Sequence, residues 1–552
     1  MTDIKDSRDD RTPGNISGKE WGLLPGLMLL ALLIRLFMLR YEYVLTPDGV
    51  YYAILGKNLV SGNWKEGLST YWPPLYPLLV GFSSLIFQDL EFGGRLVSVL
   101  AGMLLVVPVY LLIRDSYGQD VAALGGFLIA VYPSLTHYST RLLTESTYML
   151  LFISGILVGW SALSRGNRKA FLFTGFAFGA SYLVRPEAIG FMGLMIILTL
   201  STRLFHHHLG FKRILFNIFV LILGFAVLAF PYILYLHRET GQWTISEKLV
   251  NIAMTHSDGS RTWFGLSDDG QTTLADRVWA GNRSTGDRSE NGLGSDSPQR
   301  RTSNFLGTMT DSLKVLKYQY ESVIPEVFPP LFVLLSGLGL FRATWSKERA
   351  AKEVYLLMFF MSTLIGYGMS VSNPRFLLPL IPLFICWTSK GIVEFENWIV
   401  GTAENLDQSR TLLFKNRSLI RALLVAIVLL FLLPSMTYPI RGHKLDQPLE
   451  QKHAAMWIRD HSRPAPLIMS AGPWAAFYSG GKHLYLPDEE YSVVIEYAKR
   501  KKVDYIIIDE RWVPQQTPRL KFLLNEESQH PELKLVHKDE TSNYKLLIFE
   551  LM

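Results

Sequence analysis

Long apolar runs recur along the chain, and they constrain its fold more than any other feature. A helix needs roughly 17–25 mostly apolar residues to cross a bilayer. The runs lie at about 21–40, 93–113, 120–136, 142–163, 170–184, 187–203, 214–236, 323–341, 354–371, 376–393 and 419–436. Only 18% of the 552 residues are charged, whereas soluble domains contain about 25%. The sequence therefore predicts an α-helical polytopic membrane protein with about eleven transmembrane helices.

Basic residues between the apolar runs predict the orientation in the membrane. If the N-terminal tail (1–20) is cytoplasmic, the connections rich in Lys and Arg fall on the cytoplasmic side of the transmembrane domain (21–438), which is the positive-inside pattern. These connections are 164–169, 202–213, 342–353 and 390–421. Topology thus accounts for the net charge of +6, and nucleic acid is not an expected partner. We expect a multi-pass protein of the inner (plasma) membrane.

Two long loops are expected on the outer side. The first loop (41–92) contains an apolar run, 73–87, that begins with closely spaced prolines and is too short to span. It predicts a helix lying at the outer membrane surface. In the second loop (237–322), the stretch 281–303 consists largely of Gly, Ser, Asp and Arg and is expected to form a mobile flap.

The C-terminal region (439–552) alternates strand-like and helix-like patterns. Helices are expected at 449–460 and 489–502. The expected strands are APLIMS, HLYLP, VDYIIIDE, LKLVHKD and YKLLIFEL. This pattern predicts a small α/β domain, which the topology places outside the cytoplasm.

Asp48 stands at the head of an aromatic-rich segment just after the first span, TPDGVYYAILGKNL (46–59). The residues alone leave two interpretations open. Asp is a favoured helix N-cap, and Pro-Asp-Gly before an apolar run is a common helix start. A carboxylate in a structured outer loop is also a candidate general base. Tyr51 and Tyr52 in the same segment are supporting candidates.

Two arginines lie at outer turns between spans. Arg185 is followed by Pro186 and Glu187, and Arg375 lies in the segment SNPRFLLPLIP. Each could extend its side chain from the interface toward lipid headgroups. Each could also bind a phosphate, which suits the planar guanidinium. Glu187 is a supporting candidate beside Arg185.

Glu145 lies a few residues into the fourth span from its outer end. An ionisable group at that depth is a functional candidate, although Glu145 could also pair with Arg141 one helical turn earlier. His137, at the outer end of the third span, and Arg141 are further supporting candidates on this side.

The sequence lacks the common motifs for binding nucleotides and metals. It contains no Walker loop, no dinucleotide glycine fingerprint and no spaced Cys or His pattern for zinc. Cys386 is the single cysteine, so no intrachain disulfide can form. Chemistry driven by ATP or by a nicotinamide is therefore not expected.

Several short motifs, spread in order along the whole chain, resemble one enzyme superfamily. They are TPDGVYYA, WPPLYPLL, GGRLVSVLAG, LLTESTYML, SYLVRPEAIGF and NPRFLLPLIPL. The chain resembles the polyprenyl-phosphate-sugar-dependent transferases of the glycosyltransferase C (GT-C) class. This superfamily includes the protein O-mannosyltransferases and bacterial aminoarabinose lipid A transferases, and the chain looks similar to glycosyltransferase family 39. The resemblance implies a GT-C-like fold.

The resemblance also implies roles for the candidate residues. Asp48 corresponds to the proposed general base, and Arg185 and Arg375 are candidates to bind the lipid phosphate. Many members carry Asp-Glu where this chain has Asp48-Gly49, so Glu145 is the candidate for a second carboxylate, for the acceptor or for a metal. No cofactor is required, although Asp48 and Glu145 could hold a divalent metal.

The expected function is transfer of a sugar from a polyprenyl-phosphate donor to an acceptor hydroxyl on the outer face, with inversion at the anomeric carbon. The expected partners are this donor, the bilayer, and an acceptor that is a lipid, a glycan or a protein. One alternative is a flippase or transporter of lipid-linked glycans, which needs functional charges deep within several spans. Another is an O-antigen-type ligase or polymerase with a donor anchored through diphosphate.

Overall fold

Every apolar run found in the sequence contains helix in the computed structural model. The structure describes residues 20–205, 210–248, 264–266, 270–273, 275–276, 324–368, 374–405, 416–441, 446–525, 530–540 and 542–552. The helix bundle consists of α1 (Glu20–Met38), α5 (Leu90–Leu104), α6 (Val106–Tyr117), α7 (Gln119–Val131), α8 (Pro133–Ser139), α9 (Glu145–Arg165), α10 (Arg168–Tyr182), α11 (Ala188–Phe205), α12 (Phe211–Thr240), α16 (Ile324–Val327), α17 (Pro330–Phe341), α18 (Lys347–Gly368), the 3-10 helix η3 (Pro374–Leu380), α19 (Ile381–Asn405) and α21 (Arg417–Arg441).

Not all of these helices meet the length and apolarity needed to cross a bilayer alone. Among the described residues, six segments do, and the pair α7 and α8, bent by 52°, makes a seventh. The six are Gly22–Tyr41, Leu90–Tyr117, Glu145–Arg165, Phe211–Thr240, Pro374–Thr402 and Arg417–Tyr438. The chain is thus a multi-span membrane protein, and the number of eleven crossings stays a prediction.

The helix α19 lies at the centre of the bundle, and α21 lies at its edge. In the most apolar window, 83% of the residues of the α19 segment are buried, against 17% for α21. Glycines allow the close packing of α19 on α17, because a Cβ atom at Gly391 would clash with the carbonyl oxygen of Leu335. Small residues at such contacts are typical of helices that pack within a membrane. Because so little of α21 is buried, its exposed apolar face is suited to contact lipid.

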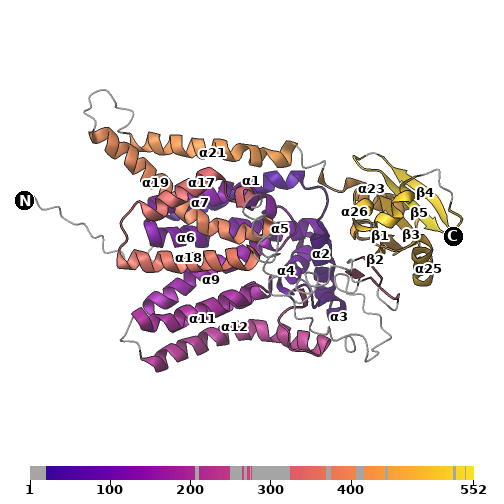
Figure 1. Ribbon diagram of the computed structural model, residues 1–552, viewed down its shortest axis with the longest axis horizontal. Helices are drawn as coiled ribbons and strands as arrows, with labels where there is room; N and C mark the ends of the chain where they lie inside the picture. Colours follow the sequence, from indigo (N-terminus) through magenta and orange to yellow (C-terminus); the bar gives the residue numbers. More distant parts are fainter. Residues whose placement is uncertain are drawn as a thin grey trace, which may run out of the picture.

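Polar contacts define the two ends of the bundle. At one end, Arg421 of α21 pairs with Glu396 of α19 at 2.7 Å and with Asp120 of α7 at 3.4 Å. At the other end, the bundle meets the first outer loop and the C-terminal domain (Figure 1). The candidate site residues from α2, α9, the turn after α10 and η3 gather at this second end.

The first outer loop folds into three short helices, α2 (Pro47–Val60), α3 (Trp64–Gly67) and α4 (Leu75–Phe87). Thr46 is the N-cap of α2, since its hydroxyl accepts a hydrogen bond from the amide of Gly49 at 3.1 Å. The interpretation of Asp48 as the cap is therefore wrong, because Pro47 occupies the first helical position and Asp48 lies within the first turn. Its carboxylate is left available for other contacts.

The helix α4 confirms the helix expected at 73–87 and exposes an apolar face. Phe82, Leu85, Ile86 and Phe87 are all exposed, as suits a helix resting in the outer leaflet. Its other face packs on α2, where a Cβ atom at Gly81 would clash with the carbonyl oxygen of Gly56. The helix α4 thus supports α2 from one side.

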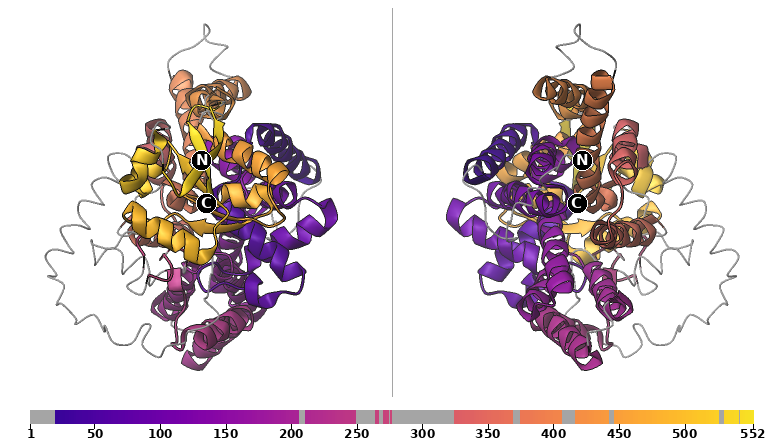
Figure 2. Two further views of the ribbon diagram at one scale, coloured as in Figure 1. Left: turned by 90° about the vertical axis from the view of Figure 1, so that its right-hand side faces the viewer. Right: turned by 90° about the vertical axis from the view of Figure 1, so that its left-hand side faces the viewer.

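The C-terminal domain contains one five-stranded sheet of order β2-β1-β3-β5-β4. The strands β2, β1 and β3 are parallel, whereas β5 pairs antiparallel with both β3 and β4. The strands are β1 (Leu467–Ser470), β2 (Lys482–Tyr485), β3 (Tyr505–Asp509), β4 (Leu533–Asp539) and β5 (Leu546–Leu551), and the helices are α23 (Leu449–His461), α24 (Trp474–Ser479), α25 (Tyr491–Lys501), α26 (Val513–Gln516) and the 3-10 helix η4 (Pro518–Leu524). The α/β pattern predicted from the sequence is confirmed. Viewed end-on, the domain covers the middle of the bundle and leaves α12 at the rim (Figure 2).

Two predicted features lie outside the described residues. These are the flap at 281–303 and, apart from Glu20, the N-terminal tail at 1–20. Both stay predictions.

Candidate active site

An ion pair joins Asp48 to Arg375 across 327 residues of sequence. The Nη2 atom of Arg375 donates a hydrogen bond to Oδ2 of Asp48 at 2.6 Å. Asp48 lies in the first turn of α2, where the helix dipole favours a negative charge. Among the described residues, none donates a hydrogen bond to the other carboxylate oxygen, Oδ1. Arg375 therefore orients the carboxylate and leaves one oxygen available.

Glu145 is the first residue of α9 and is completely buried. Its Oε1 atom lies 3.3 Å from Nε of Arg375 and 3.7 Å from Nη1 of Arg185. The alternative that Glu145 pairs with Arg141 is therefore not what the structure shows, because helix packing brings the two more distant arginines to this carboxylate instead. Glu145 thus connects the two arginines predicted to bind phosphate.

Arg185 lies in the turn between α10 and α11 and is 3% exposed. Its Nη2 atom is 3.5 Å from Oε1 of Glu187. Three aromatic rings surround the guanidinium, with ring centroids 4.9–5.9 Å from its Cζ atom: Tyr148, Tyr367 and Phe376. Its Nε and Nη1 atoms are buried without a hydrogen-bond partner in the part of the chain that the structure describes. Buried donors of this kind are rare in folded proteins unless a ligand or water satisfies them.

The charges of this cluster lower the pKa of Asp48 and of Glu187. Burial raises the pKa of Asp48, but the positive charges of Arg375, Lys248 and Arg185 together outweigh it, so the pKa lies below its ordinary value. Glu187 shows the same balance, with burial opposed chiefly by Arg185. Both carboxylates therefore stay ionised at neutral pH.

Lys248 is a third cation of the cluster, and the sequence analysis missed it. Its side chain is buried, with Nζ 5.8 Å from the ring centroid of Tyr71 and 5.6 Å from that of Trp72. Burial lowers the pKa of this ammonium group, although Glu187 and Asp48 act in the opposite direction. No motif marks Lys248 in the sequence, because it is one of several charged residues in the long second outer loop.

Tyr51 and Tyr52 lie on α2 one turn after Asp48 and point to different neighbours. The hydroxyl of Tyr51 is 2.8 Å from that of Tyr485, on strand β2 of the C-terminal domain. Tyr52 packs edge-to-face on Trp72, with ring centroids 5.1 Å apart. Nothing in the sequence distinguishes Tyr485 from the other aromatic residues in strands, so it was not predicted as a site residue.

His137 and Arg141 do not join this cluster. They contact Glu42, with His137 Nδ1 at 3.7 Å and Arg141 Nε at 3.3 Å from its Oε1 atom. A small cavity between α1, α8 and α21 adjoins this group, and Glu42 and His137 both line it. Both side chains thus contact Glu42, and a supporting role for them at Asp48 would have to act through that residue.

A metal site does not fit the two acids that the sequence suggested for it. Arg375 bridges Asp48 and Glu145, so a cation is already present between them. Within the described residues, no group of three or more His, Cys, Asp or Glu side chains is placed to hold a metal ion.

Comparison with known proteins agrees with this architecture. A family model described as dolichyl-phosphate-mannose-protein mannosyltransferase matches residues 72–237. ArnT from Cupriavidus metallidurans, solved with bound undecaprenyl phosphate, is similar with a TM-score of 0.57 at 15% identity, over 96% of this chain and 98% of that chain. The Archaeoglobus fulgidus oligosaccharyltransferase, solved in complex with Zn and sulfate, is similar with a TM-score of 0.51 at 14% identity, over 95% of this chain and 72% of that chain. The search of curated proteins returned no match. The predicted resemblance to GT-C glycosyltransferases is confirmed at the level of the fold.

Proposed function

We propose that this chain, which has the fold of GT-C glycosyltransferases, transfers a sugar from a polyprenyl-phosphate donor to an acceptor hydroxyl. One observation carries the proposal: Arg185 presents buried, unsatisfied N–H groups next to an ionised Asp48 whose Oδ1 atom is available. A phosphate would satisfy the arginine, and an acceptor hydroxyl would satisfy the carboxylate. The bound undecaprenyl phosphate of the similar ArnT supports a lipid phosphate as the ligand.

The proposed reaction is a direct displacement. The bond between the anomeric carbon and the phosphate oxygen breaks, and its electron pair stays on the polyprenyl phosphate. The acceptor oxygen forms the new bond from the opposite face of the sugar, and its proton passes to Asp48. A single displacement inverts the configuration at the anomeric carbon.

The donor is a phosphodiester with one negative charge, and the leaving phosphate monoester carries up to two. Cations beside the phosphate therefore stabilise the transition state more than the bound donor. In this proposal Arg185 and Lys248 supply that charge. Arg375, predicted as a second phosphate ligand, mainly holds Asp48 ionised and oriented through its hydrogen bond. The arginine bridge between Asp48 and Glu145 leads us to infer that no metal takes part.

The proposal is tested with the purified full chain and a radiolabelled sugar on polyprenyl monophosphate. We expect transfer to acceptors extracted from the envelope of the source cell, and the same rate when a chelator is added. The matching polyprenyl diphosphate donor is expected to be a poor substrate. Transfer from the diphosphate donor alone would favour a ligase or polymerase, and loss of transfer with the chelator would contradict the inference about metal.

We propose that the end of the bundle carrying the site faces away from the cytoplasm. The connection between α9 and α10 would then be cytoplasmic. Arg165 at the end of α9 and Arg168 and Lys169 at the start of α10 flank this connection, in agreement with the positive-inside rule. Alkaline phosphatase, which is active only outside the cytoplasm, is expected to be inactive when fused after Gly166 and active when fused after Met552. The reverse pattern would contradict this orientation.

A further inference from the structure

The segment between α1 and α2 leads directly to Asp48, and the C-terminal domain and its connection to α21 hold the backbone of this segment. Gln447 lies just before α23. Its Oε1 atom accepts hydrogen bonds from the amides of Tyr43 at 2.7 Å and Val44 at 2.9 Å. Its Nε2 atom donates to the carbonyl oxygen of Tyr41 at 2.8 Å. One side chain thus binds three backbone groups of this segment, which is neither helix nor strand at Tyr43 and Val44.

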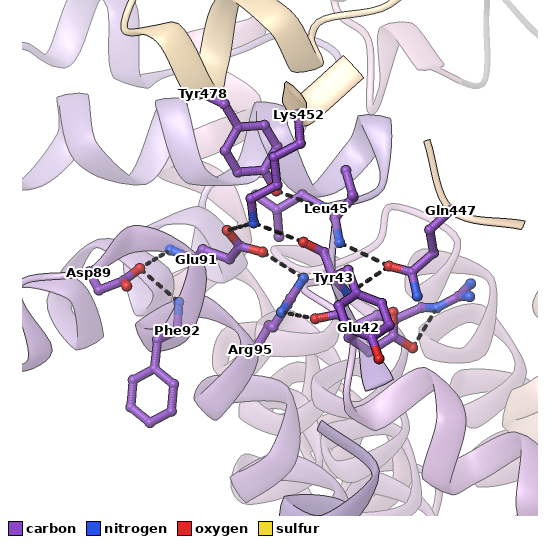
Figure 3. Close-up of polar contacts among 12 residues, drawn as sticks. Glu42, Tyr43, Leu45, Asp89, Glu91, Phe92, Arg95, Gln447, Lys452 and Tyr478 are labelled. Atoms are coloured by element: carbon purple, nitrogen blue, oxygen red, sulfur yellow. Dashed lines mark hydrogen bonds and ion pairs between the residues drawn. The ribbon is translucent and has the colours of Figure 1, made fainter. Parts of the chain in front are cut away.

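The next residue of this segment, Leu45, is bound on both backbone groups by α24. Its amide donates to the hydroxyl of Tyr478 at 2.9 Å, and its carbonyl oxygen accepts from Nε1 of Trp474 at 2.8 Å. Lys452 of α23 donates to the carbonyl oxygen of Tyr43 at 2.8 Å and lies over the ring of Tyr478. Figure 3 shows Tyr478 and Lys452 beside the segment, together with Gln447.

The membrane domain holds the same segment from the opposite side. Arg95 of α5 donates to the carbonyl oxygen of Glu42 at 2.6 Å and pairs with Glu91 at 2.7 Å. Lys452 also approaches Glu91, at 3.5 Å. The segment is therefore fixed between α5 and the C-terminal domain (Figure 3).

A separate contact holds α2 beyond Asp48. Tyr485 ends β2, the edge strand of the sheet, and its hydroxyl is hydrogen-bonded to that of Tyr51. The backbone amide of Tyr485 donates to Oδ1 of Asp276 at 2.9 Å, in the second outer loop. Asp48 is thus flanked on both sides along the chain by contacts with the C-terminal domain.

We propose that the C-terminal domain is a positioning element of the active site, which sets the place of Asp48 relative to Arg185 and Glu145 through Gln447, Trp474 and Tyr485. This inference rests on the proposed role of Asp48 as the base. The carboxylate is held by Arg375 of the membrane domain, whereas the backbone that carries it is held by the C-terminal domain. A shift of about 1 Å at a reacting group can cost about 100-fold in rate, so these contacts affect the chemical step.

Gln447 provides a graded test in the full chain. In Gln447→Leu all three hydrogen bonds are lost, and we expect kcat to fall about 10- to 100-fold while KM for the polyprenyl-phosphate donor changes less than about twofold. Donor binding is spared because its proposed cations belong to other elements. Gln447→Glu keeps an acceptor for the two amides and is expected to be intermediate. Tyr485→Phe, which removes only one hydroxyl, is expected to lower kcat in the same way, by less.

Tyr491→Phe is the matched control. Tyr491 begins α25, and this change removes the hydrogen bond that its hydroxyl donates to Glu532, just before β4, within the same domain but away from the segment. The kcat of this variant is expected to equal that of the wild type. Equal losses in Tyr491→Phe and Gln447→Leu would show a general effect of domain stability and would overturn the proposal. An unchanged kcat in Gln447→Leu would overturn it as well.

Hydrogen exchange separates this inference from the proposed function. In the full chain, peptides covering 41–51 are expected to exchange faster in Gln447→Leu than in the wild type and to be unaffected in Tyr491→Phe. If the wild type transfers no sugar from a polyprenyl monophosphate, the proposed function fails, and the exchange rates still decide whether the domain holds this segment. Equal exchange in wild type and Gln447→Leu would overturn the inference whatever the activity.

Discussion

Replacing Asp48 with Asn is expected to lower kcat for sugar transfer by about 10²–10⁴-fold, the usual contribution of a general base. The amide keeps the shape of the side chain and an oxygen that can accept the hydrogen bond from Arg375. It has no basic oxygen to take the proton of the acceptor hydroxyl. The protein should therefore fold and bind donor, and the loss should appear in kcat measured at saturating donor and acceptor.

The pH dependence of the wild type gives a second measurement on the same residue. Because burial is outweighed by the neighbouring cations, the pKa of Asp48 lies below its ordinary value. A free Asp has a pKa of about 3.9, so the carboxyl group of Asp48 loses its proton at a lower pH than that. On acidification, kcat should therefore not fall until the pH is below the pKa of a free Asp. A decline centred near pH 6 or 7 would point to another base.

Asp89→Asn is the matched control for Asp48→Asn. Asp89 is also an acid of the first outer loop at a helix N-terminus, where it caps α5 by accepting hydrogen bonds from the amides of Glu91 and Phe92. Asn caps helices about as well as Asp, so this variant should retain wild-type kcat and stability. Full activity in Asp48→Asn would remove the role of this residue as the base.

The sequence placed four residues of the site at one end of the bundle but did not predict how they would pair. Asp48, Glu145, Arg185 and Arg375 all lie at helix ends on the side opposite the basic connections, so topology alone brings them to one end of the bundle. Their pairing depends on the rotation and tilt of α9, η3 and the α10–α11 turn. Those angles follow from packing contacts far apart in the chain, which hydrophobic periodicity does not encode.

Some misses had a signal in the sequence, and others had none. Thr46 precedes Pro47, and Pro is favoured at the first position of a helix, so Thr46 could have been predicted as the cap of α2. In contrast, Lys248 and Tyr485 reach the site from a long loop and a strand edge. The place of Tyr485 depends on how the C-terminal domain docks on α2, and that of Lys248 on how the second outer loop packs on Tyr71 and Trp72. Only the folded chain shows these arrangements.

Replacing Arg185 with Lys is expected to lower kcat by about 10²–10³-fold, the usual loss when one donor to a developing negative charge is removed, and to raise KM for the donor. Lys keeps the positive charge beside Glu145 and Glu187 but loses the planar fork that binds two phosphate oxygens at once. The ammonium also cannot stack among the three aromatic rings as the guanidinium does.

Arg349→Lys separates this effect from the general cost of altering an Arg–Glu pair. Arg349 pairs with Glu353 at 3.3 Å on α18, and Glu353 also accepts from Tyr117 at the end of α6, so the pair lies at the end of the bundle away from Asp48. Its loss should lower stability without changing kcat or KM.

Because phosphate charge grows as the donor bond breaks, Arg185→Lys should affect donors with poor leaving groups most. Wild-type kinetics in Arg185→Lys would show that the buried N–H groups of Arg185 serve the fold and not the donor.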